Sequence, residues 1–321
     1  MLPVIRLNPF YPGQWGVPGS DNNLGLRSWS QSKVMYVDYA HAAANDSNDG
    51  TDPNFPLSTI QAAIGKLEHN YDVIRVRSIN SSGESVVTPA YNATYSHVTI
   101  EGIGDTPYAP SWISAAVNTP CLDLRAVGWR IRGFRFYGPT GAACIELRHT
   151  DSGANDIAIR TIIEDNLFDG LTVGLAGIIT HGCYDVWIRN NIFQLFHNAG
   201  GTAACISLGV APLAIPYRCH IIGNVFWDCD NGVDHPCNGC EIAQNRFQPV
   251  GYAYTMTTVL RTNTIANPGD DNIVWGNVMP GDYSIVGGYV PGAADTWIGN
   301  MADDTAEAEV GDNGWTIARP T

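Results

Sequence analysis

Acidic side chains and a histidine fall within copies of a short strand-like phrase, and the spacing could bring carboxylates together. The copies read Cys121-Leu-Asp-Leu124, Cys144-Ile-Glu-Leu147, Gly177-Ile-Ile-Thr180, Cys205-Ile-Ser-Leu208 and Gly232-Val-Asp-His235. If the flanking apolar residues point inward, an outward row remains, consisting of Asp123, Glu146, Ile179, Ser207 and Asp234. Neighbouring strands lie about 4.8 Å apart, so Asp123 and Glu146 would be adjacent carboxylates that could cleave a glycosidic bond.

The densest acidic cluster lies late in the chain and comprises Asp228, Asp230, Asp234 and His235. The catalytic candidates are therefore Asp123, Glu146, Asp234 and His235. Two other interpretations stay open for the acidic row: it could bind calcium, or it could be a solvated surface. No other cofactor is expected.

A second phrase predicts the elements that position these residues. It consists of a β-branched or aromatic residue, two variable positions, Asn, one further residue, then Phe or Met. Copies read Ile163-Glu-Asp-Asn166-Leu-Phe168, Ile188-Arg-Asn-Asn191-Ile-Phe193, Ile221-Ile-Gly-Asn224-Val-Phe226, Ile242-Ala-Gln-Asn245-Arg-Phe247 and Val274-Trp-Gly-Asn277-Val-Met279. Repeats of roughly 20 to 50 residues are typical of stacked units that share one continuous core.

The two phrases predict strands without helices between them. Both alternate with period two and are separated by Gly, Asn, Asp and Pro, so the chain can coil, with each turn laying its strands parallel on the previous turn. The recurring Asn would lie at a tight bend, where its amide can bond the next turn and its backbone can be left-handed. The Phe and Met positions would stack inside.

This pattern resembles the right-handed single-stranded parallel β-helix of the pectate-lyase-like superfamily, an all-β solenoid, over residues 34–302. The entry segment strengthens the resemblance through Asn48-Asp-Gly-Thr51 and Asn54-Phe-Pro-Leu-Ser-Thr-Ile-Gln-Ala-Ala-Ile64. Many such proteins open in this way with a helix that caps the first coil. We expect that helix at residues 58–69, with Ser58 and Gln61 as a capping box and an apolar stripe of Ile60, Ile64 and Leu67.

The resemblance implies a fold that hosts lyases, hydrolases, tailspikes and inert structural proteins. The Asn-Thr-Asp, Asp-Asp and Gly-His-Gly motifs of polygalacturonases are not present in a matching place. A pectate-lyase mechanism needs a calcium cluster and an outward Arg as base. Arg132, Glu164 and Arg189 occupy one position of successive copies, which we interpret first as a ladder of salt bridges.

Tryptophans provide candidates for carbohydrate binding. Trp187 and Trp275 sit beside inward positions and are predicted to face outward, where sugar rings could stack on them. Packing beneath loops is the other interpretation, and it is the one we favour.

The eight cysteines are interpreted as small apolar core residues. Pro236-Cys-Asn-Gly-Cys240 has the spacing of half a zinc site, which Cys219 or Cys229 with His220 or His235 would complete. The Asn-Gly pair also fits a turn between strands, and this is the interpretation we favour, so no metal site is predicted.

Composition argues against several classes of partner. The formal net charge is −14 and only 15% of residues are charged, which argues against nucleic acid. No apolar stretch approaches the roughly 18 residues of a membrane-spanning helix, so no membrane insertion is expected. The first residues do not have the basic start and apolar run of a secretory signal, and we expect synthesis in the cytoplasm of a host cell.

Residues 1–33 form an extended arm rich in proline, with Phe10, Tyr11, Trp15 and Trp29 as apolar anchors. We predict that this arm attaches the protein to another chain, and that residues 303–321 form an acidic C-terminal cap. The favoured function is a non-enzymatic structural or adhesive protein on a bacteriophage virion, as a capsid decoration or tail-associated protein. Its partners would be other virion proteins, further copies in a homo-oligomer (by resemblance a trimer), and a host surface glycan. The alternative is a tailspike-like polysaccharide lyase or glycoside hydrolase.

Overall fold

A computed structural model describes the chain in several segments. They are residues 32–90, 93–104, 106, 108–149, 157–197, 201–208, 215–248, 258–262, 269–279, 289–292 and 294–302. The arm anchors Phe10, Tyr11, Trp15 and Trp29 lie outside these residues, as does the predicted cap at 303–321.

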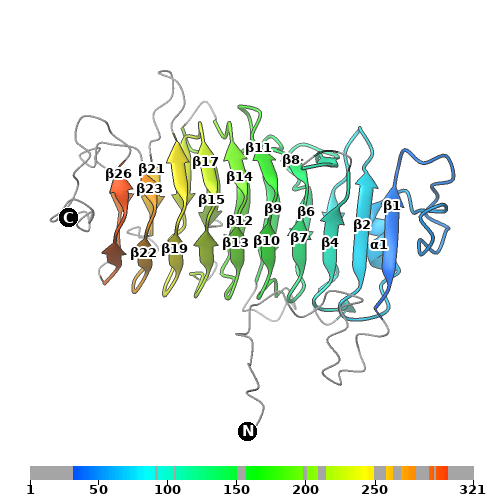
Figure 1. Ribbon diagram of the computed structural model, residues 1–321, viewed down its shortest axis with the longest axis horizontal. Coiled ribbons are helices and arrows are strands. Elements are labelled where there is room, and N and C mark those ends of the chain that lie inside the picture. Colours follow the sequence, from blue (N-terminus) through cyan, green and yellow to red (C-terminus); the bar gives the residue numbers. More distant parts are fainter. Residues whose placement is uncertain are drawn as a thin grey trace, which may run out of the picture.

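Three parallel sheets make up the described fold (Figure 1). Sheet A contains β1 (Val34–Asp38), β2 (Val73–Ser78), β4 (Thr99–Gly102), β7 (Arg130–Arg132), β10 (Ile162–Glu164), β13 (Trp187–Arg189), β16 (His220–Ile222), β19 (Glu241–Ala243), β22 (Ile273–Trp275) and β25 (Thr296–Ile298). Sheet B contains β3 (Val86–Val87), β6 (Leu122–Leu124), β9 (Ala143–Arg148), β12 (Ala176–His181), β15 (Ala204–Leu208), β18 (Asn231–Asp234), β21 (Thr258–Arg261) and β24 (Tyr289–Val290). Sheet C contains β5 (Ser111–Trp112), β8 (Arg135–Tyr137), β11 (Leu167–Asp169), β14 (Ile192–Gln194), β17 (Val225–Trp227), β20 (Arg246–Gln248), β23 (Val278–Met279) and β26 (Met301–Ala302).

From β7 onward, each turn of the chain passes through sheets A, C and B in that order. Successive turns stack along the long axis of the molecule, from the blue N-terminal coils to the red C-terminal coils (Figure 1). The predicted right-handed parallel β-helix is therefore confirmed. In the described part of the chain, no helix is long and apolar enough to cross a membrane.

A ladder of buried asparagine amides runs along the bend between sheets A and C. Its members are Asn166, Asn191, Asn224, Asn245, Asn277 and Asn300, each at most 1% exposed. Asn224 is typical: its Nδ2 donates to Ile188 O at 2.9 Å and to Asn245 Oδ1 at 3.0 Å. The predicted bonding of each amide to neighbouring coils is confirmed. The left-handed backbone, however, belongs to the residue before each Asn, for example Gly223 with φ 68°.

Aromatic rings stack inside the coil behind this ladder. Consecutive ring centroids from Phe136 through Phe168, Phe193 and Phe226 to Phe247 are 4.6–5.2 Å apart. This spacing equals the distance between neighbouring strands, because each coil contributes one ring at the same position. The prediction that the Phe positions stack in the interior is confirmed.

The capping helix α1 (Ile60–Gly65) is shorter than predicted and starts differently. Its N-cap is Thr59, whose hydroxyl accepts a hydrogen bond from Ala62 N. Ser58 and Gln61 do not form a capping box: Gln61 Oε1 accepts from Val87 N, and Glu84 accepts from the first helical N–H groups. A carboxylate from a later coil thus takes the role that was assigned to a local side chain.

We predict that Asn224→Ala lowers the free energy of unfolding by about 3 kcal/mol or more. The change leaves Ile188 O and the N–H of Asn191 without buried partners, at roughly 1–3 kcal/mol each. Urea denaturation measures the loss, with Asn54→Ala as the control at an exposed asparagine. Equal midpoints for the two variants would contradict a stabilising role for the ladder.

Candidate functional site

The outer row of sheet B has the predicted register. Asp123 pairs with Glu146, Glu146 with Ile179, Ile179 with Ser207, and Ser207 with Asp234. Asp123 and Glu146 are therefore adjacent, but Arg148 lies against both. Its Nε donates to Asp123 Oδ1 at 2.9 Å and its Nη2 to Glu146 Oε2 at 2.5 Å. The Arg148 guanidinium bonds to both carboxylates and lies where a sugar or a calcium ion would have to bind.

The protonation of Glu146 does not suit a catalytic acid. Burial tends to raise its pKa, but the neighbouring His181, with Nε2 3.6 Å from Oε2, and the charge of Arg148 outweigh burial, so the pKa lies below the usual 4.5. Glu146 is then ionised at neutral pH, whereas a general acid in glycoside cleavage must carry a proton.

Asp234 and His235 are not part of that pair. Asp234 lies three strands further along sheet B than Glu146 and forms an ion pair with Arg261, with 2.7 Å between its Oδ1 and the arginine Nε. His235 points inward and is fully buried, with its Nε2 2.8 Å from Thr180 Oγ1. Burial lowers the pKa of His235 to about 4.

The predicted cluster of Asp228, Asp230, Asp234 and His235 is likewise divided. Asp230 Oδ1 lies 2.8 Å from Nδ1 of the buried His197, and Asp228 approaches the other nitrogen of that ring at 3.4 Å. The four catalytic candidates, Asp123, Glu146, Asp234 and His235, therefore do not assemble into one site.

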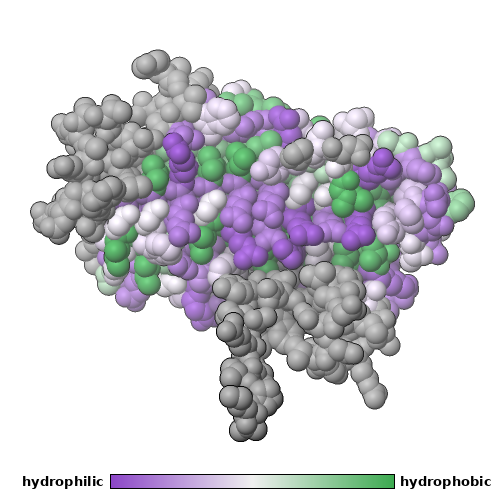
Figure 2. Space-filling model, in the orientation of Figure 1, coloured by the Kyte–Doolittle hydropathy of each residue, from purple (hydrophilic) through white to green (hydrophobic). Residues whose placement is uncertain are grey.

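The outer face of sheet A has a different charge balance, which sequence reasoning noticed only in part. Strands β2, β4, β7, β10 and β13 carry five arginines and two glutamates, a formal charge of +3. The arginines are Arg75, Arg77, Arg130, Arg132 and Arg189, and the glutamates are Glu101 and Glu164. We call these seven residues the cationic strip. Figure 2 shows the hydrophilic band that crosses this face.

Ion pairs order the cationic strip. Glu164 accepts from Arg189 Nε at 2.7 Å and also pairs with Arg130, while Arg132 pairs with Glu101. The predicted ladder through Arg132, Glu164 and Arg189 has the predicted register, but Arg132 bonds the earlier coil. Each glutamate thus lies between two arginines, which leaves an excess of positive charge.

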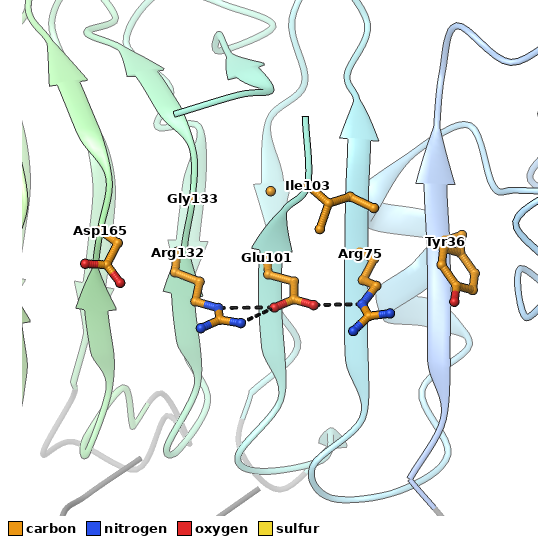
Figure 3. Close-up of a pocket in the computed structure, with 8 residues that line it drawn as sticks. Tyr36, Arg75, Glu101, Ile103, Arg132, Gly133 and Asp165 are labelled. Carbon is orange, nitrogen blue, oxygen red and sulfur yellow. Dashed lines mark hydrogen bonds and ion pairs between the residues drawn. The ribbon is translucent and has the colours of Figure 1, made fainter. Parts of the chain in front are cut away.

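A pocket of about 470 Å³ opens over the N-terminal half of the strip (Figure 3). Tyr36, Arg75, Glu101, Ile103, Arg132 and Asp165 line it. Gly102 and Gly133 also line the pocket and let their two coils approach closely, because a Cβ on Gly102 would lie 2.4 Å from Gly133 O. Glu101 bridges the two guanidinium groups, accepting from Arg75 Nε at 2.8 Å and from Arg132 Nε at 3.1 Å.

The two carboxyl groups of the pocket have opposite pKa shifts. Burial tends to raise the pKa of Glu101, but the hydrogen bonds from Arg132 and Arg75 outweigh it and lower the pKa. Although Asp165 is exposed, desolvation by nearby groups and the charge of the neighbouring Glu164 raise its pKa. Sequence analysis missed this pair because Glu101 lies in a coil before the first copy of the Asn phrase.

The two predicted sugar-binding tryptophans lie on the same sheet, with Trp187 on β13 of the strip and Trp275 on β22 beyond it. Trp187 and Trp275 are half-buried and flank the inward residues Ile188 and Val274. The Trp187 ring stacks on His220 with centroids 3.9 Å apart, and the Trp275 indole donates to Glu241 Oε1 at 2.9 Å. One face of the Trp187 ring is therefore covered by the His220 ring.

A three-sheet coil with rows of paired charges on its outer faces defines this protein as a right-handed parallel β-helix. No family model matches the sequence, and no curated protein matches it significantly.

Solved structures of three kinds are similar to it in fold. An alginate lyase from Paenibacillus sp. str. FPU-7 is 16% identical with a TM-score of 0.49, over 76% of this chain and 85% of that one. The GH136 lacto-N-biosidase from Eubacterium ramulus is 11% identical with a TM-score of 0.41, over 84% and 62% of the two chains. The Dettilon tailspike protein is 14% identical with a TM-score of 0.27, over 83% and 67%. These likenesses concern the fold alone.

We predict that Glu101→Gln lowers the free energy of unfolding at neutral pH but not at acid pH. Because the folded pKa of Glu101 is depressed, its contribution is present above about pH 4.5 and is lost as pH falls through the folded pKa. The loss at neutral pH should be roughly 1–2 kcal/mol. Urea midpoints measured against pH test this, with Asp52→Asn as an exposed control. A difference from wild type that persists unchanged at low pH would contradict the assignment.

Proposed function

We propose that the protein is a non-enzymatic adhesive β-helix that binds an anionic polysaccharide along the outer face of sheet A. The observation that carries the proposal is the formal charge of +3 on the strip strands of a chain whose net charge is −14. Acidic proteins repel polyanions, but salt screens that repulsion over about 8 Å, so a local excess of arginine decides binding at contact.

The chemistry of the cationic strip suits carboxylated sugars. Guanidinium groups bind carboxylates through paired, charge-assisted hydrogen bonds. Arg75 and Arg132 line the pocket with side chains 43% and 41% exposed, so both can reach a ligand. Tyr36 offers an aromatic surface in the same pocket. The strands are straight and regularly spaced, so an extended polymer can follow them (Figure 1).

The absence of cleavage is the second part of the proposal. Asp123, Glu146 and Asp234 all form ion pairs with arginine, and Glu146 has a lowered pKa. These groups support the outer face of sheet B as a structural network.

The proposed setting is the surface of a bacteriophage particle, as a capsid decoration or tail-associated protein. The composition of the arm at 1–33 supports attachment to other virion proteins or to further copies of the chain. The polysaccharide would then be a host surface glycan.

Hydrolysis in the pocket is a second candidate, favoured by the opposite pKa shifts of Glu101 and Asp165. Groups whose pKa values are pushed apart can divide the roles of base and acid. Under this alternative, acidic polysaccharides would yield new reducing ends, and Asp165→Asn would abolish the activity while leaving binding intact.

We predict that Arg75→Ala and Arg132→Ala each weaken binding of a polyuronate such as alginate by about tenfold or more. A hydrogen bond to a charged group contributes roughly 1.5–3 kcal/mol. Titration calorimetry at several salt concentrations measures the affinity, and a reducing-end assay on the same samples tests for cleavage. The matched control is Arg261→Ala, which removes an arginine from sheet B.

An equal loss of polyuronate affinity in all three variants would overturn the proposal. So would a wild-type protein that has no affinity for any polyuronate. Cleavage that depends on Asp165 would replace it with the hydrolase.

We predict that removing residues 1–33 abolishes self-association without changing polyuronate affinity. The arm carries the predicted attachment anchors, whereas the cationic strip begins at Arg75. Analytical ultracentrifugation of the full chain and the shortened chain measures the assembly. A full chain that sediments as a monomer, or a shortened chain that still associates, would contradict self-association through the arm.

A further inference from the structure

The turn between β18 and β19 brings together three buried metal-binding side chains. One ring nitrogen of His235 and the sulfurs of Cys237 and Cys240 lie within 4.8 Å of one another. All three side chains are at most 1% exposed. The Asn238-Gly239 turn predicted here is present, with Gly239 at φ 61°, and it folds the two cysteines toward each other. The turn and the half-site spacing are therefore compatible.

The histidine ring supplies an independent sign of a ligand. Its Nε2 lies 2.8 Å from Thr180 Oγ1, which orients the ring. Its Nδ1 is buried and has no hydrogen-bond partner in the structure. A buried ring nitrogen without a partner is costly. A hydrogen bond on one ring nitrogen that leaves the other nitrogen bare is the usual arrangement around a metal-bound histidine.

The sulfur of Cys240 also has a polar partner. It accepts a hydrogen bond from Cys219 N at 3.2 Å, and its own backbone N–H is held by Asn272 Oδ1 at 2.9 Å. Cys219 occupies the equivalent position of the preceding coil, since His220 pairs with Glu241. Its thiol interacts with that of Cys240, although it lies outside the set of three mutually close ligand atoms.

We propose that His235, Cys237 and Cys240 bind a structural zinc ion, with Cys219 as the fourth donor or as a hydrogen-bonding neighbour. Zinc takes thiolate and imidazole ligands at about 2.3 and 2.1 Å, which places tetrahedral ligands about 3.8 Å apart. The observed separations therefore need only small side-chain rotations.

Charge balance favours this ion in a buried turn. Two thiols lose their protons to solvent on binding, and Zn²⁺ with two thiolates and a neutral imidazole carries no net charge. A neutral unit avoids the high cost of burying an uncompensated ion.

The test uses the full chain, stripped with chelator under reducing conditions and titrated with Zn²⁺ or Co²⁺. We expect about one metal per chain, about two protons released per metal, and about three if Cys219 is also a thiolate. Co²⁺ should give thiolate charge-transfer absorption and the visible bands of a tetrahedral site. Zn²⁺ should raise the thermal midpoint.

Cys237→Ala and Cys240→Ala should each lower the affinity for the metal by more than roughly 10–100-fold. That smaller loss is typical when a residue that only hydrogen-bonds to a metal ligand is removed. Cys144→Ala is the matched control, as an equally buried cysteine outside the trio. Wild-type protein that gives no thiolate absorption with Co²⁺ would overturn the proposal, even if the variants fail to fold. Equal affinity in Cys240→Ala and the control would overturn it too. Neither result depends on polysaccharide binding.

Discussion

The structure depends on one constraint: a solenoid whose stacked coils have no helices between their strands must satisfy the backbone groups of every bend inside its own core. The asparagine ladder meets this constraint. Each side-chain amide carries both donors and acceptors, so one residue type can bond the coil before and the coil after. Serine or aspartate could offer only part of this set. The bend can therefore be buried at the same place in every coil from Asn166 to Asn300.

A fixed bend has a consequence for the outside of the molecule. Because the register is locked, residues at one position of successive coils form straight rows about 4.8 Å apart. A carboxylate in such a row always meets the side chain of the next coil at close range. Arginines at neighbouring positions therefore pair with it, as Arg148 does with Asp123 and Glu146. The rows thus define both the structural networks and the charge that a ligand meets.

Much of this was predictable from the sequence, because the repeat is a physical one. Alignment of the Cys and Asn phrases placed Asp123 beside Glu146, and the registers agree. The same alignment put His235 in the inward slot of Leu124 and Leu147, which its assignment as a catalytic candidate overlooked. The pocket could not be predicted in this way. Its Arg75 and Glu101 come from coils without the Asn phrase. The contact between Glu84 and the helix could not be predicted either, because its partner Gln61 lies 23 residues earlier.

The same rows support the proposal that this protein binds a polysaccharide rather than cleaving it. Glycoside hydrolysis needs a carboxylic acid that keeps its proton at working pH, which requires a raised pKa. A carboxylate between arginines on adjacent coils is pushed the other way, as for Glu101. Asp165 has a raised pKa, and it belongs to the exposed turn rather than to a strand row. Catalysis on such a solenoid would therefore have to recruit turn residues, whereas recognition of an extended anion needs only the rows themselves.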